Sequence, residues 1–228
     1  MKLPKTFIPE NNLENNINRL MFEKIMVYEK HDIYLNRLKI EEGIRIGHSN
    51  KKLYTTFDQS LSILKKAGYE RHLYPWEHFE IVIQHLEGKL DGQLYNLARD
   101  LRSSNGCWLN MAIKRSGDML LCYDNPKNME WRKYKKKYVN CSTQKNTNVL
   151  SLNGVSSQEW VKLKSFDNEF VSFFCNRNFE ELPQKMQEES AIYLPPEGVL
   201  WPISMSDGGL SICGYVTYRM CRGVKERK

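Results

Sequence analysis

The residue types that bind nucleic acid are concentrated at positions 130–140, which read EWRKYKKKYVN. Five cations stand there among three aromatic side chains. Cations neutralise backbone phosphates, and aromatic rings stack on unpaired bases. We therefore predict a contact surface for RNA or single-stranded DNA over positions 131–138. In chain order its residues are Trp131, Arg132, Lys133, Tyr134, Lys135, Lys136, Lys137 and Tyr138.

Two conformations of this run remain open from the sequence. A helix over about 126–138, capped by Asn125, would put the three aromatic side chains on one stripe and the lysines in water. An extended strand would put every second residue from Arg132 to Tyr138 on one side, as a mixed basic and aromatic surface. The chain's last eleven residues, YRMCRGVKERK, form a second basic segment that could fray and reach the same ligand.

Three histidines in RHLYPWEHFEIVIQHLEG invite a metal site. Helical residues that share one ion lie three or four positions apart, whereas His78 and His85 are seven apart, about 10 Å along the axis. His72 lies before the helix that we predict here. We expect no bound metal and no cofactor.

Three further patterns predict ordinary structure rather than chemistry. Residues 87–89, Glu-Gly-Lys, have the Glu-x-Lys spacing of some metal-dependent nucleases. They fall where the predicted helix should end, and Gly88 is better explained as its cap. Asp118, Asp124 and Glu130 could converge on a metal, yet turns and helix caps account for them. Residues 206–209, Ser-Asp-Gly-Gly, lead into β-prone sequence, so a hairpin turn is a better account than a phosphate loop.

The six cysteines include no Cys-x-x-Cys pair, which argues against a structural zinc site. We expect them to be reduced and mostly buried. They are Cys107, Cys122, Cys141, Cys175, Cys213 and Cys221.

The elements that must position these residues begin with helices. Apolar residues repeat at three- and four-residue steps in four segments before residue 106, and each segment predicts a helix. Thr56 and Gln59 form a capping box for the second, and Pro75 suits the first position of the third. The four segments cover about 11–26, 56–67, 75–87 and 91–101.

The second half of the chain predicts mostly sheet. Residues 107–114 and 119–124 flank a Gly-containing turn, and residues 199–205 and 210–220 repeat this pattern, so we predict two hairpins. Pro202 places its strand at a sheet edge or in a bulge. Between the hairpins, EFVSFFC at 169–175 predicts a buried strand, and residues 178–189 predict a short acidic helix interrupted by proline.

Length and composition fit a globular protein. With 41% apolar residues, a chain of 228 residues can bury a core. No apolar run approaches the roughly 20 residues that span a bilayer, and the first residues lack the apolar stretch of a secretory signal. We therefore expect a cytoplasmic location and no membrane contact. The net charge of +7 favours polyanionic partners.

These patterns together predict an α+β fold. A helical N-terminal half (about 1–104) is packed against, or followed by, a mostly antiparallel β-sheet half (about 105–222). We expect a single domain over 1–228, with residue 104 as the alternative boundary.

The predicted function is a non-catalytic association with nucleic acid through positions 131–138, with RNA or a single strand favoured. One alternative is an enzyme with a dispersed active site in the cleft between the two halves, which would bring His72, His78 or His85 to face Cys107 or Asp100. The other alternative is a protein-interaction module or homo-oligomer. Its exposed apolar patch would centre on Trp76, Trp108 or Trp201.

Overall fold

The computed structural model describes most of the chain in segments. The predicted helix over about 11–26 lies outside these segments. They are residues 33–35, 38–40, 45–48, 54–66, 69–103, 106–126, 129–134, 137–140, 147–155, 160–214, 219–220 and 222–225.

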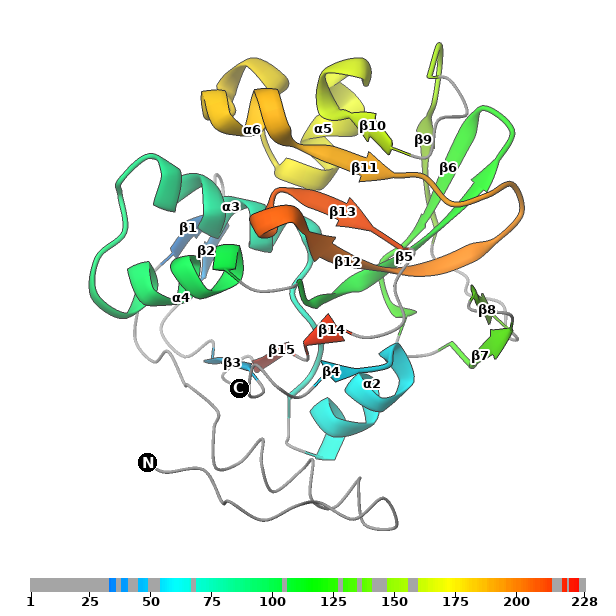
Figure 1. Cartoon of the computed structure of the whole chain (residues 1–228), viewed down its shortest axis with the longest axis horizontal. Coiled ribbons are helices and arrows are strands. Elements are labelled where there is room, and N and C mark those ends of the chain that lie inside the picture. Colours follow the sequence, from blue (N-terminus) through cyan, green and yellow to red (C-terminus); the bar gives the residue numbers. More distant parts are fainter. Residues whose placement is uncertain are drawn as a thin grey trace.

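A curled, seven-stranded mixed sheet dominates the described fold (Figure 1). Only the pair β11–β13 is parallel, and the other neighbours are antiparallel. With the helices described next, this confirms the α+β class. In spatial order the strands are β10 (Trp160–Lys162), β11 (Ala191–Tyr193), β13 (Ser211–Cys213), β12 (Leu200–Ser206), β5 (Trp108–Ser116), β6 (Met119–Tyr123) and β9 (Asn148–Ser151).

Helices lie around this sheet (Figure 1). Helix α3 packs against α4, α5 and strand β5, and short 3₁₀ turns join the smaller elements. The α-helices are α2 (Phe57–Lys66), α3 (Pro75–Leu86), α4 (Gly92–Ser103), α5 (Asn168–Cys175) and α6 (Gln184–Glu189). The 3₁₀ turns are η3 (Leu163–Ser165), η4 (Phe179–Glu181) and η5 (Asp207–Gly209).

Local sequence signals position the described N-terminal helices as predicted. Thr56 and Gln59 form the capping box of α2, because each backbone N–H donates to the other side chain, at 3.0 and 3.3 Å. Pro75 begins α3, and Gly88 follows that helix at φ 68°, a conformation that favours glycine. The predicted helices at 56–67, 75–87 and 91–101 are thus confirmed to within about two residues.

Among the described residues, four short strand pairs lie outside the large sheet. Two of them join the first quarter of the chain to its end, so the N-terminal half is not purely helical. In the basic tail, residues 219–220 and 222–225 are paired in strands. The pairs are β1 (Ile33–Leu35) with β2 (Leu38–Ile40), β3 (Arg45–His48) with β15 (Arg222–Lys225), β4 (Tyr54–Thr55) with β14 (Arg219–Met220), and β7 (Trp131–Tyr134) with β8 (Lys137–Asn140).

The strand predicted over 169–175 is wrong, because these residues form helix α5. The Asp167 carboxylate caps it by accepting a hydrogen bond from the Phe170 backbone N–H at 2.8 Å. Asn176 ends it in the left-handed conformation, at φ 56°. Phe170 and Phe174, four residues apart, are both buried.

Strand β12 is interior rather than at an edge, since it lies between β13 and β5. Pro202 cannot donate a hydrogen bond to a neighbouring strand, and the register with β5 shifts between Pro202 and Ser204. The bulge that the proline predicted is therefore confirmed, and the edge position is wrong.

One cluster of buried apolar side chains takes members from both sides of residue 104. It includes Phe79, Val82 and Ile83 of α3, together with Leu109 of β5 and Phe170 of α5. The apolar stripe predicted for the third helix is thus core. Within the described residues, no helix combines the length and the apolar character that crossing a membrane requires.

Candidate functional site

The predicted contact surface at 131–138 lies on the hairpin β7–β8, so of the two conformations left open the extended one is found and the helix over about 126–138 is wrong. Residues 131 and 140 pair at its base, and Tyr134 pairs with Lys137 at its other end. Trp, Tyr and Val suit a pleated surface, and this preference wins over the helix signal of Pro126. Lys135 and Lys136 lie outside the described residues.

Trp131 anchors the base of the hairpin. Its side chain is buried, at 9% exposure, and its indole N–H donates to the carbonyl oxygen of Pro126 at 3.1 Å. Its ring meets Phe57 of α2 edge-on, with centroids 5.2 Å apart, and Phe57 in turn meets Trp108 of β5 at 5.3 Å. Trp131 therefore holds the hairpin to the core and offers little surface for base stacking.

The strand register divides the remaining predicted residues between two faces. In an antiparallel pair, opposite residues lie on the same face and successive residues alternate. Arg132, Tyr134 and Lys137 thus occupy one face of the hairpin, whereas Lys133 and Tyr138 share the other face with Trp131. Because the chain reverses, Tyr134 and Tyr138 lie on opposite faces, unlike in the single strand considered from the sequence.

His78 lies beside Cys107, which is one of the contacts expected for the alternative of an enzyme with a dispersed active site. The His78 Nδ1 and the Cys107 Sγ are 4.0 Å apart, and the His78 Nε2 lies 3.3 Å from the carbonyl oxygen of Gly209. A tautomer that donates from Nε2 leaves Nδ1 to accept from the thiol. Both side chains are fully buried, so no substrate reaches this pair, and it is better explained as a satisfied polar contact in the core.

A second His pair is equally enclosed. The Ser60 hydroxyl lies 2.7 Å from the His72 Nε2, and both residues are fully buried. The arrangement has the distance of a nucleophile and its base, but it lacks access. Among the described residues, no three His, Cys, Asp or Glu side chains lie close enough together to hold a metal ion.

Two of the three tryptophans proposed as the centre of a protein-interaction patch are not exposed. Trp108 and Trp201 are buried, at 0% and 2% exposure, so neither forms an exposed apolar patch. Trp76 is half-buried and stacks on Tyr74, with centroids 5.7 Å apart.

Two ion pairs of α3 with buried carboxylates were not predicted from the sequence. Glu77 accepts two hydrogen bonds from Arg71, at 2.6 and 2.7 Å. Glu80 accepts two from Arg177, at 2.6 and 3.1 Å. Arg177 is 97 positions away from Glu80, so no local pattern could have predicted this pair.

Comparison of the chain with protein-family models, curated proteins and solved structures found no match. No relative therefore contributes a function. The basis for a functional proposal is the arrangement of the chain's own residues.

Proposed function

We propose that this protein binds RNA or single-stranded DNA without catalysing a reaction, and that the hairpin β7–β8 makes the contact. One observation carries the proposal. The hairpin register gathers Tyr134 with Arg132 and Lys137 on one face, while Trp131 anchors the other. A tyrosine and two cations at register positions of one face form the combination of residue types that stacks an unpaired base and follows its phosphates.

A single strand suits this face better than a duplex. Stacking on Tyr134 requires an unpaired base, and a paired base in a duplex does not offer its ring. The sequence carries no helix-turn-helix or zinc-finger signature that would read a major groove. The net charge of +7 adds a general attraction to phosphates.

The two faces of the hairpin provide a matched test of the cations. Short single-stranded RNA and DNA are titrated by fluorescence at two salt concentrations. We expect Lys137→Gln to weaken binding to any sequence and to lower the salt slope by about 0.7, which is the loss of one phosphate contact on a single strand. Lys133→Gln removes the same charge from the face of Trp131 and should leave the slope nearly unchanged.

The two tyrosines provide the matching test of stacking. Tyr134→Ala should cost about 1–3 kcal/mol of binding free energy and leave the salt slope unchanged, whereas Tyr138→Ala should bind like the wild type. Thermal melts of both variants establish that the hairpin still folds. Absence of saturable binding by the wild type at low salt, or equal losses for the variants of the two faces, would contradict the proposal.

A further inference from the structure

Strand β9 forms one edge of the large sheet, and within the described residues it pairs with β6 alone. Figure 1 shows it beside β6 at the upper right of the molecule. Its inner face is covered, because Leu150 belongs to the buried core cluster that also contains Phe170 of α5. Its outer face is open, since Val149 is 52% exposed and Met119 of β6 is 46% exposed.

The two exposed apolar side chains lie on one face of the sheet. The register of β6 and β9 puts Val149 opposite Leu121, and Ser151 opposite Met119. Opposite residues share a face, and so do residues two positions apart on one strand. Val149 and Met119 therefore flank the half-buried Leu121, and an apolar surface runs up to the edge of the sheet.

The backbone groups along this edge point out of the sheet. In an antiparallel pair, residues that bond to the partner strand alternate with residues whose N–H and C=O point away from it. The Leu152 N–H donates to the Asp118 carbonyl oxygen at 2.7 Å, one position beyond the register of β6 and β9. Leu150, two positions before Leu152, therefore also bonds to β6. Val149 and Ser151 flank Leu150, so their N–H and C=O groups point away from β6.

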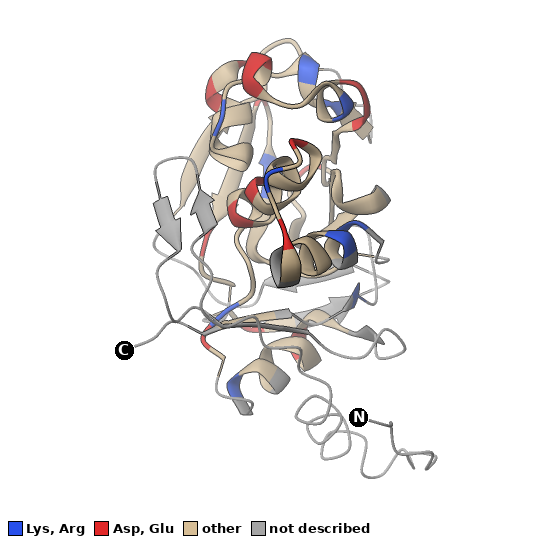
Figure 2. Ribbon diagram, turned by 90° about the vertical axis from the view of Figure 1, so that its left-hand side faces the viewer, with Lys and Arg blue, Asp and Glu red and all other residues tan. Residues whose placement is uncertain are grey.

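The sequence around β9 lacks the features that usually prevent an edge strand from pairing. Native edge strands carry lysine or another charge, a proline or a bulge. Residues 146–158 contain no charged residue and no proline, although 27% of the chain's residues are charged. Figure 2 shows the opposite side of the molecule, where acidic and basic residues lie on the helices that face the viewer.

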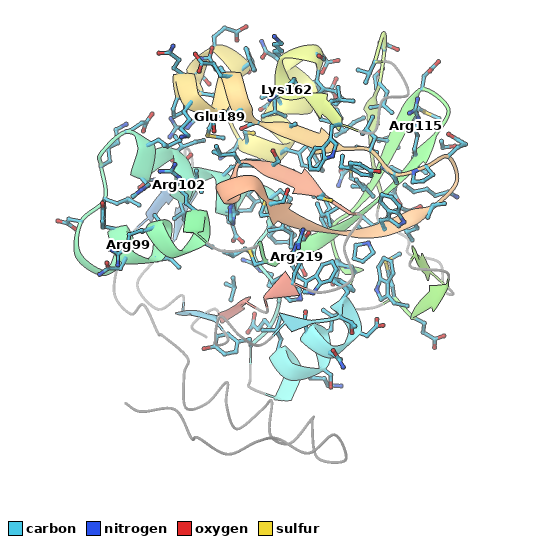
Figure 3. All side chains as sticks on the ribbon, in the orientation of Figure 1. Arg99, Arg102, Arg115, Lys162, Glu189 and Arg219 are labelled. Carbon is cyan, nitrogen blue, oxygen red and sulfur yellow. The ribbon has the colours of Figure 1, made fainter. Side chains whose placement is uncertain are left out.

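The other edge of the same sheet has such a feature. Lys162 is exposed at the end of β10, and its Nζ donates to the carbonyl oxygens of Glu188 and Glu189 at 3.2 and 3.1 Å, which links this edge to the end of α6 (Figure 3). Every open sheet must have two edges, so an edge position alone requires no partner. An uncharged edge beside exposed apolar side chains is not explained in this way.

We propose that β9 pairs with β9 of a second copy of this chain, antiparallel and about a two-fold axis at Leu150. Val149 then lies opposite Ser151 of the second copy, and each such pair exchanges two backbone hydrogen bonds. This register uses the outward groups of both residues in both copies. The same edge serves both copies, as a two-fold interface requires, and its use by one partner closes the assembly at two chains.

Side chains and charge fit the same arrangement. In this register the Val149 side chains of the two copies become diagonal neighbours, so the exposed apolar surfaces of the two sheets join. Each copy carries a net charge of +7, and like charges at a contact oppose association. An edge without charged residues is therefore a favourable place for two copies of this basic chain to meet.

The first test measures the mass of the full chain by analytical ultracentrifugation over a range of concentrations. We expect a reversible shift toward twice 26.9 kDa as the concentration rises. Val149→Lys should raise the dissociation constant by roughly 10- to 100-fold, because it removes an apolar contact and sets like charges beside each other. Trp160→Lys is the control, since it replaces an exposed apolar residue on the opposite edge strand, β10.

Two outcomes of this test would overturn the proposal. One is a wild type that stays monomeric at every concentration, which would leave the edge to a different extended segment. The other is an equal effect of Val149→Lys and Trp160→Lys. Thermal melts establish that each variant is folded. If Val149→Lys does not fold, Ser151→Pro decides, because it removes an outward N–H that β6 does not use.

Hydrogen exchange followed by NMR tests whether the dimer forms by strand pairing. The amides of Val149 and Ser151 should exchange fast in dilute monomer and slowly at concentrations that favour the dimer, whereas the Leu150 amide is protected by β6 in both states. A dimer in which the first two amides still exchange fast would contradict pairing through β9.

The dimer does not depend on the function proposed for the hairpin. Tyr134→Ala should leave the monomer–dimer equilibrium unchanged, and Val149→Lys should leave the binding of a short oligonucleotide to one chain unchanged. Failure of the hairpin proposal and failure of the dimer proposal are therefore distinguishable.

Discussion

The imidazole of His85 is less easily protonated in the folded chain than in the unfolded one. Burial and the charge of Arg102 lower its pKa below the ordinary value of 6.5. As the pH falls through 6.5, the unfolded state takes up a proton that the folded state refuses, so the free energy of unfolding decreases. We therefore expect His85→Gln to gain stability relative to the wild type between pH 7 and pH 5. Urea denaturation at the two pH values measures the difference.

The comparison between variant and wild type isolates His85 from the other histidines, since these are present in both proteins. Arg102→Gln should shift the NMR titration of His85 upward, toward 6.5, because one of the two causes is removed. A stability difference that does not change with pH would show that His85 titrates normally.

Two buried thiols should be unreactive in the folded protein. Burial raises the pKa of Cys175, and burial together with the charge of Asp124 raises the pKa of Cys122. The thiolate is the reactive form, so both residues should resist a thiol reagent at pH 8 until denaturant is added. Peptide mapping after brief labelling checks this, and labelling of Cys175 as fast as that of a free thiol would contradict the burial of α5.

The sequence allows some of these residue environments to be predicted but not their partners. Burial of the cysteines follows from residue type, and the four described ones are all buried. The relation between His85 and Arg102 joins two helices across 17 positions, and the one between Glu80 and Arg177 joins residues 97 positions apart. Tertiary packing creates both relations, so no local pattern contains them.

At the scale of elements, the ion pair between Glu80 and Arg177 links α3 to the end of α5. The Glu80 side chain is 1% exposed, and that of Arg177 is 15% exposed. Arg177→Met would leave a buried carboxylate with one remaining donor, the amide of Gln84 at 3.0 Å. We expect a loss of about 3–5 kcal/mol in the free energy of unfolding, the range for breaking a buried pair.

A double variant tests whether this loss comes from the unpaired charge. Glu80→Gln combined with Arg177→Met removes both charges and should be clearly more stable than Arg177→Met alone. Chemical denaturation of the single and double variants measures the difference. Equal stabilities would mean that Arg177 acts by packing and not by its charge.

Helices and strands were predictable where a capping or turn residue accompanied the regular spacing of apolar residues. Helices α2 and α3 carry such signals, in Thr56 and Pro75, and both were predicted. Helix α5 was misread because EFVSFFC is too short and too apolar for its period to decide, and the decisive residues, Asp167 and Asn176, lie just outside it. For the hairpin β7–β8 the sequence left a helix and a strand open, because the helix signal of Pro126 competed with the β-forming residues that follow.

At the scale of the whole molecule, the order in which the strands pair could not be predicted from the sequence. Strand β3 pairs with β15, and β4 pairs with β14, so segments from the first quarter of the chain lie beside segments from its end. In the large sheet, β11 pairs with β13 in parallel, so the prediction of a mostly antiparallel sheet holds for five of its six pairings. Contacts between distant segments depend on how the core fills, and the local sequence does not encode that.

The net charge of +7 raises the question of whether nucleic acid would bind to the whole basic surface or to one patch. A variant in which Lys135, Lys136 and Lys137 become Gln should lower the salt slope of single-strand binding by as much as about 2, at roughly 0.7 per lost phosphate contact. The matched control changes Arg99, Lys164 and Lys185 to Gln. These residues are exposed on α4, η3 and α6, and their loss lowers the net charge equally.

The two triple variants distinguish binding at the hairpin from binding that depends on the net charge of the whole protein. If the hairpin is the contact surface, the control variant keeps the salt slope of the wild type, because phosphate contacts are local and charges beyond a Debye length of about 10 Å are screened at 0.1 M salt. If binding is a property of the net charge, both variants lose affinity and slope together. Fluorescence titrations of one oligonucleotide at several salt concentrations, with thermal melts of each variant, therefore decide whether β7–β8 is the contact surface or only one basic segment among several.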